Sequence, residues 1–74
     1  MSTVPLPRLG EPLSARELQV LDGISRGLSN GQIGRKLGIT GNTVGTHCRR
    51  LFAKLGARDR ANAVHLGHRA GVLT

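Results

Sequence analysis

The side chains in this sequence that are best suited to chemistry are cations and small polar groups gathered between residues 35 and 54. The set comprises Arg35, Lys36, Asn42, Thr43, Thr46, His47, Arg49, Arg50 and Lys54. Lys and Arg bind phosphate oxygens, and Asn, Thr and Arg also bind the edges of bases. Because Asp59 is the only acid between residues 29 and 60, this segment is expected to bind an anion.

Catalytic and metal-binding chemistry find little support in the same sequence. His65 and His68 lie three apart, but His47 is distant and no second ligand pair accompanies them. Cys48 is the only cysteine and falls on an apolar stripe, so we expect a small buried residue rather than a reactive thiol. No nucleophile paired with a base, paired carboxylates or phosphate-binding loop stands out. We therefore predict a non-enzyme with no metal and no cofactor.

The composition predicts a single small domain that binds duplex nucleic acid. The 74 residues carry a formal net charge of +7, and the clustered cations favour phosphate neutralisation over a merely solvated surface. Phe52 is the only aromatic residue, so a platform for stacking unpaired bases is lacking and duplex DNA fits better than single strands or RNA. Neither a run of ~18 apolar residues nor a signal peptide is present. A cytoplasmic protein acting at the nucleoid, with no membrane partner, is expected.

Two helices joined by a short turn are predicted to position the cations. The first begins after Ser29, which forms a capping box with Gln32, and ends at Gly38, which can adopt the left-handed conformation that closes a helix. The second follows the cap residue Thr40 and spans residues 41–55. This order is typical of a helix-turn-helix, whose second helix enters the DNA major groove. A short hairpin of two helices in any helical protein has the same outline.

The helix over residues 41–55 is predicted to have one apolar and one polar face. Apolar side chains recur at intervals of four, three and four at Val44, Cys48, Leu51 and Leu55. The opposite face carries Asn42, Thr46, Arg49 and Ala53, flanked by Gly45 and Arg50. We expect the apolar face to pack on the core and the polar, basic face to lie against the anion.

A further helix is predicted on the N-terminal side of this unit. It begins at Ser14, in a capping box with Glu17, and ends at Gly27. Its buried face is expected to consist of Leu18, Leu21 and Ile24 or Ser25. Residues 1–13 contain three prolines and no helical period, which predicts a flexible N-terminal arm.

The last predicted helix begins at its cap Asp59 and runs to about Ala70. Its inward side is expected to consist of Ala63, Val64, Gly67, Ala70 and Gly71. A neighbouring, partly exposed strip consists of Asn62, Leu66 and Arg69, which we predict to form a dimer interface. Together these elements predict an all-α, four-helix bundle-like domain over residues 14–74, with the helix-turn-helix at about 30–49.

Several glycines fall inside the predicted helices, where each costs about 1 kcal/mol relative to alanine. Gly34 and Gly67 face inward and are expected to permit close contact between helices. Gly45 faces the presumed ligand, where the sequence offers no packing reason for a glycine.

The chain resembles the LuxR/GerE effector domain from residue 13 to residue 73. The matching segments are LSARELQVL, GLSNGQIGRKLGIT, NTVGTHCRRLFAKLGARDRANAV and AGV. The resemblance implies a four-helix DNA-binding module of a bacterial transcription regulator, with residues 41–55 as its recognition helix. Such modules usually follow a receiver or ligand-sensing domain, and this sequence looks like the stand-alone form.

Residue by residue, the resemblance implies that Thr46 and Arg49 lie at base edges. It places Thr43 and Arg50 near phosphates, and His47 where it braces the helix or meets the DNA backbone. The family commonly has lysine where this chain has Gly45, so one base or phosphate contact is missing. For that reason the family's target sequence does not carry over to this chain.

Three functions compete at this point. The leading one is a sequence-specific transcription regulator that binds duplex DNA as a homodimer, because one recognition helix reads only about four to six base pairs. A module like region four of sigma factors shares the helix-turn-helix but works bound to RNA polymerase, and the segment KLGARDRANAV argues against it. A protein-interaction module or antagonist that lost groove reading at Gly45 is the third, and it is disfavoured by Arg49, Arg50 and Lys54. RNA polymerase is a further candidate partner of the regulator.

Overall fold

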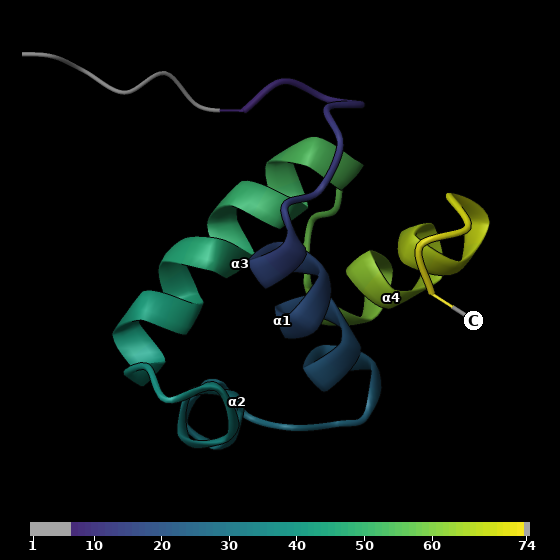
Figure 1. Ribbon diagram of the computed structural model, residues 1–74. Helices are drawn as coiled ribbons and strands as arrows, with labels where there is room; N and C mark the ends of the chain where they lie inside the picture. The colour runs from purple at the N-terminus through teal and green to yellow at the C-terminus, as the bar shows by residue number, and fades with distance from the viewer. Residues whose placement is uncertain (1–6, 74) are drawn as a thin grey trace, which may run out of the picture.

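Four α-helices make up the computed structural model, which describes residues 7–73 (Figure 1). They are α1 (Ala15–Ser25), α2 (Asn30–Leu37), α3 (Gly41–Leu55) and α4 (Arg60–Arg69). In Figure 1, α3 runs along one side of the molecule, α1 lies between α3 and α4, and α2 lies at one end. The described residues contain no strand, which confirms the predicted all-α, four-helix class. Within the same residues, no helix is long and apolar enough to cross a membrane.

Each helix begins at the side-chain cap that the sequence predicts. Ser14 Oγ accepts from the Glu17 N–H at 3.1 Å, and Glu17 Oε1 accepts from the Ser14 N–H at 2.9 Å, which completes the capping box of α1. Ser29 and Gln32 form the same pair of bonds at the start of α2. The caps of α3 and α4 are Thr40 and Asp59. Because these bonds satisfy free N–H groups locally, they define the helix starts from neighbouring residues alone.

The hydrophobic core draws side chains from all four helices. It consists of Val20, Leu21, Ile24, Ile33, Val44, Cys48, Leu51 and Ala63. The apolar stripe predicted for α3 is confirmed, because its first three members are buried and Leu55 packs against the edge of the core. Packing of this stripe turns the opposite face of α3 outward.

The prediction for the buried face of α1 is confirmed at Leu21 and, of the alternatives Ile24 and Ser25, at Ile24, but it was wrong at Leu18, which is exposed. Val20 and Glu17 are buried instead, with exposed fractions of 0% and 2%. The face of α1 that packs on the core therefore includes the carboxylate of Glu17. The physical reason is the partner that this carboxylate finds there, Lys54.

The prediction for the inward side of α4 is confirmed within the helix and was wrong for the two residues that follow it. Ala63 and Gly67 are buried, whereas Ala70 and Gly71 are exposed. A Cβ atom on Gly67 would lie 3.0 Å from Leu21 Cδ2 and 2.9 Å from Leu73 Cδ1, so the predicted close contact at this glycine is confirmed. Ala70 and Gly71 are exposed because the helix ends at Arg69 and the chain turns there.

The turn between α2 and α3 is built on two glycines. Gly38 has a φ of +75°, the left-handed conformation predicted for the end of α2. Gly34 faces the turn so closely that a Cβ atom would lie 2.5 Å from the Ile39 carbonyl oxygen. Since backbone cannot yield as a flexible side chain can, glycine at position 34 sets how closely α2 approaches the start of α3.

The described part of the predicted N-terminal arm is tied to α3. We call residues 9–13 the N-terminal strap. Its Gly10 N–H donates to the Lys54 carbonyl at 2.8 Å, its Pro12 carbonyl accepts from Lys54 Nζ at 3.0 Å, and Leu13 packs against the core. Residues 1–6 of the arm lie outside the described residues. The two hydrogen bonds to Lys54 could not be predicted from local sequence patterns, because they join residues about forty positions apart.

Candidate nucleic-acid interface

The outward face of α3 carries the polar residues that the helical period assigns to it. Asn42, Thr46 and Arg49 are all exposed. They lie on successive turns, and Thr46 Oγ1 donates to the Asn42 carbonyl at 3.3 Å. Side chains that combine donors and acceptors on an exposed helix are able to meet the pattern of donors and acceptors at base edges.

Thr43 and His47 are two further predicted site residues on α3. Thr43 is exposed, and its hydroxyl lies 3.0 Å from that of the cap residue Thr40. His47, one turn further along α3, is half-buried. A half-buried imidazole suits the role of bracing the helix.

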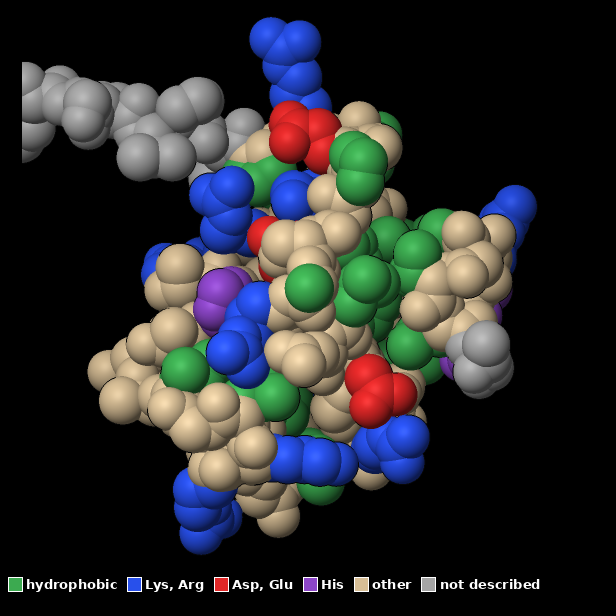
Figure 2. Space-filling model, viewed as in Figure 1, with side chains coloured by type: hydrophobic (Ala, Val, Ile, Leu, Met, Phe, Trp, Pro, Cys, Tyr) green, Lys and Arg blue, Asp and Glu red, His purple; other side chains and the backbone are tan. Residues whose placement is uncertain are grey.

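Cations on α2 extend the basic surface beyond α3. Figure 2 shows Lys and Arg side chains along the side of the molecule that α3 and α2 form. Arg35 and Lys36 are both exposed. Lys36 also lines a groove between α1 and α2 with Leu18 and Asp22, which places it at the border of the basic surface.

Gly45 leaves open the outward face of α3 with Asn42, Thr46 and Arg49, which we call the reading face. A Cβ atom at this position would meet only Asn30 Nδ2, at an ordinary contact distance of 3.8 Å. Packing therefore does not require a glycine here, unlike at Gly34. The neighbouring amide is held in place, because Asn30 Oδ1 accepts from Arg60 Nη1 at 2.6 Å. The helical period of α3 cannot predict Asn30 as a neighbour of the reading face, since Asn30 belongs to α2.

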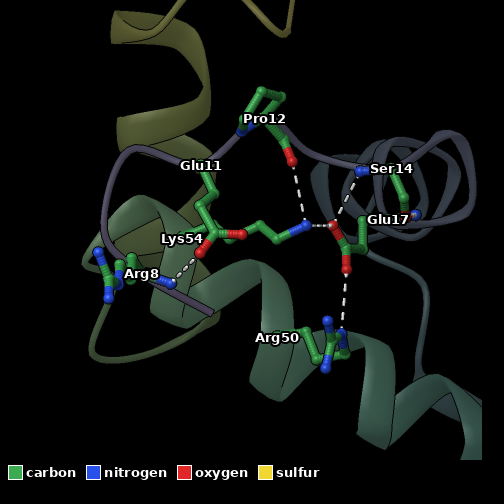
Figure 3. Close-up of polar contacts among 7 residues, drawn as sticks. All are labelled: Arg8, Glu11, Pro12, Ser14, Glu17, Arg50 and Lys54. Atoms are coloured by element: carbon green, nitrogen blue, oxygen red, sulfur yellow. Dashed lines mark hydrogen bonds and ion pairs between the residues drawn. The ribbon is translucent and has the colours of Figure 1, made fainter. Parts of the chain in front are cut away.

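Lys54, one of the predicted DNA contacts, is mostly buried and pairs with a carboxylate of α1. Its side chain is 8% exposed, and its Nζ lies 2.7 Å from Glu17 Oε1 (Figure 3). Desolvation raises the pKa of Glu17, but the hydrogen bonds from Lys54 and Ser14 and the charge of Lys54 outweigh it and hold the pKa below its ordinary value. The ammonium group therefore donates to partners within the domain, Glu17 and the Pro12 carbonyl.

Arg60 is another cation that works inside the domain. Its Nη1 donates to Asn30 Oδ1 at 2.6 Å and its Nη2 donates to the Leu28 carbonyl at 2.5 Å. These bonds connect the start of α4 to the first residue of α2 and to the loop before it. A count of charges along the sequence cannot separate such a residue from the surface cations Arg35 and Arg49.

The residues predicted for a dimer interface lie on α4 but have unequal surroundings. Asn62 is half-buried and its Oδ1 accepts from the Arg58 N–H at 3.2 Å, so it supports the start of its own helix. Leu66 is half-buried and Arg69 is exposed. The latter two line a shallow groove with Leu9 and Val72.

No group of three or more His, Cys, Asp and Glu side chains within residues 7–73 is close enough together to hold a metal ion. Burial raises the pKa of the Cys48 thiol, with a smaller opposing effect from Arg60. A thiol with a raised pKa inside the core is a poor nucleophile.

The fold and the exposed face of α3 define a helix-turn-helix domain in which α2 and α3 form the motif. The family model "Bacterial regulatory proteins, luxR family" matches residues 11–67, and the chain belongs to this family. The family is one of regulatory proteins and not of enzymes. The resemblance seen in the sequence is thereby confirmed.

Similar proteins carry the domain as part of a longer chain. The uncharacterized transcriptional regulatory protein YxjL of Bacillus subtilis (strain 168) is 42% identical over 65 residues, which cover 88% of this chain and 30% of that protein. The HTH-type transcriptional regulator MalT of Yersinia pestis (strain Pestoides F) is 45% identical over 58 residues, covering 78% of this chain and 6% of MalT. A crystal structure of the response regulator ChrA from a heme-sensing two-component system matches with a TM-score of 0.82 and 36% identity, over 85% of this chain and 31% of ChrA. The chain thus spans a third or less of the length of each of these proteins.

Proposed function

We propose that this protein is a sequence-specific transcriptional regulator that binds duplex DNA with α3 in the major groove. The observation that carries the proposal is the exposed polar face of α3, which presents Asn42, Thr46 and Arg49 on the side opposite the core. An α-helix fits the major groove, and these side-chain types bind base edges there. Membership of a family of bacterial regulatory proteins supports the same function.

Phosphate contacts in this proposal come from the residues that flank the reading face. Arg35 on α2 and Arg50 and Thr43 on α3 are the principal candidates, with Lys36 at the border and His47 bracing α3 or meeting the DNA backbone. These contacts fix the register of the domain on the duplex without reading its sequence. Lys54 and Arg60 take no part, because their cationic groups are bonded within the domain.

A homodimer on DNA is a further part of the proposal. One recognition helix covers about four to six base pairs, and pairing through Leu66 and Arg69 of α4 doubles the length that is read. Both residues line the shallow groove beside the N-terminal strap. In a regulator that activates, the bound domain is then positioned to contact RNA polymerase, and its place of action is the nucleoid.

The function is tested by genome-wide mapping of the tagged protein, followed by binding to the recovered duplex at several salt concentrations. We expect discrete sites that share a motif, and an affinity that falls steeply with salt. About four phosphate contacts give a slope of log affinity against log salt of roughly −4. A flat salt titration, or an absence of enriched sites, would contradict the proposal.

A further inference from the structure

A single buried carboxylate faces two cations that lie one turn apart on α3. Glu17 of α1 is 2% exposed, and Arg50 and Lys54 approach it from the same side of α3 (Figure 3). One negative and two positive charges leave a net charge of +1 on this cluster. Which cation remains unneutralised therefore matters for binding an anion.

The carboxylate is shared unequally between the two cations. Lys54 Nζ lies 2.7 Å from Glu17 Oε1 and also donates to the Pro12 carbonyl at 3.0 Å. Arg50 Nε lies 3.6 Å from Glu17 Oε2, which is too long for a hydrogen bond, and the Arg50 side chain is 40% exposed. Lys54 thus holds the carboxylate closely, while Arg50 stays near it at the surface.

We propose that Lys54 is a positioning residue for DNA binding, which keeps Arg50 available to a phosphate by neutralising Glu17. The proposal rests on the proposed function, because it assigns a role within that DNA interface. A guanidinium carries five N–H donors. Nε faces Glu17, and the Nη groups donate to no residue within 7–73, so they are able to donate to phosphate oxygens. Lys54 itself touches no DNA.

The role of Lys54 becomes visible when its charge is removed. In Lys54→Met the carboxylate keeps its full charge in a largely dry site, where attraction between opposite charges is strong. Arg50 is the nearest remaining cation and has only to close the gap of 3.6 Å. We expect its guanidinium to bind Glu17 directly and to be lost as a phosphate contact.

The experiment compares the salt dependence of duplex binding in the wild type and four variants. Lys54→Met is expected to make the slope of log affinity against log salt less steep by about 0.9, the same change as Arg50→Ala. Removal of both charges in Glu17→Gln/Lys54→Met is expected to restore the wild-type slope. A control variant, Arg26→Met at the end of α1, removes a cation of equal charge outside the interface and is expected to keep the slope.

Failure of the double variant to restore the slope, with helical circular dichroism intact, overturns the proposal, since Lys54 would then contribute its own charge. A measurement on the protein without DNA distinguishes failure of this proposal from failure of the proposed function. The Arg50 Nε–H resonance of Lys54→Met should exchange with solvent more slowly than in the wild type, and an unchanged rate contradicts the capture of Arg50 whether or not DNA binds.

Should Lys54→Met fail to fold, the wild-type protein still tests the proposal by NMR. On addition of duplex DNA, the Arg50 guanidinium resonances should shift while the Lys54 ammonium resonance stays at its position in the free protein. The reverse pattern overturns the proposal. If the wild-type protein does not bind duplex DNA at all, the proposed function is contradicted instead.

Discussion

Arg49 and Arg60 carry the same guanidinium group in opposite environments. Arg49 is exposed on the reading face, whereas Arg60 donates to Asn30 and to the Leu28 carbonyl within the domain. Arg50 lies between these extremes, half-buried beside Glu17. The sequence shows all of them as equal charges, and only the fold reveals which ones a ligand can reach.

Replacement of the exposed arginines should separate base reading from phosphate binding. We expect Arg49→Ala to cost about 1–3 kcal/mol at a specific site and to relax base preference at one position. Arg35→Ala should weaken binding to all duplexes alike and make the salt slope less steep by about 0.9. Competition binding against a library of single-base variants measures both effects. An equal loss on every sequence for both variants would show that Arg49 is not at a base edge.

The helices themselves could be predicted closely from sequence, because their ends depend on local bonds. The capping boxes at Ser14 and Ser29 and the left-handed Gly38 involve residues at most five positions apart, and the predicted span of 41–55 is the observed span of α3. The buried face of α1 could not be predicted in the same way. Glu17 is buried because of Lys54, which lies 37 residues away, and the helical period of apolar residues contains no such information.

Gly45 lowers the stability of α3, and the packing of the domain does not require a glycine at this position. A methyl group at this position meets no atom closer than Asn30 Nδ2 at 3.8 Å, so Gly45→Ala should stabilise the domain by about 1 kcal/mol through helix propensity. Gly45→Lys should add several tenths of a kcal/mol of stability and raise affinity for all duplexes. Urea unfolding followed by circular dichroism measures the change in stability.

Gly34→Ala is the matched control, because a methyl group there meets the Ile39 carbonyl oxygen at 2.5 Å. We expect this variant to be destabilised by more than the gain in helix propensity, since backbone has to move. Stabilisation by both alanines would mean that the turn between α2 and α3 is looser than its contacts indicate.

At the scale of the whole domain, stability should depend on pH through Glu17. Its folded-state pKa is below the ordinary value of 4.5, so the folded state binds this proton less tightly than the unfolded state. The resulting stabilisation is fully present above pH 4.5 and is lost as the pH falls through the folded pKa. Urea midpoints measured from pH 7 to pH 3 should fall over the acid part of this range, and less so in Glu17→Gln/Lys54→Met. A curve of equal steepness in the double variant would assign the dependence to other carboxylates.

Assembly on DNA should depend on the groove at α4. We expect Leu66→Glu to abolish cooperative binding to two suitably spaced half-sites and to leave affinity for a single half-site nearly unchanged. The groove is too small for the ~1,200 Å² of a stable interface, so the free protein is expected to be monomeric. Leu18→Glu, an exposed leucine on α1, is the control and should bind cooperatively. Unfolding of Leu66→Glu by circular dichroism would instead show that Leu66 belongs to the core.

The rate at which a reagent labels the thiol of Cys48 reports how often the core of this domain opens. The side chain is 6% exposed, and burial raises its pKa, so a thiol reagent in solution can react only when the core separates. The labelling rate therefore measures how often α3 leaves α1 and α2, without any added probe. A ligand that binds only the closed domain lowers the labelling rate, because labelling then occurs only in the fraction of the protein that is unbound. Labelling of this buried cysteine is therefore a quantitative assay of DNA binding.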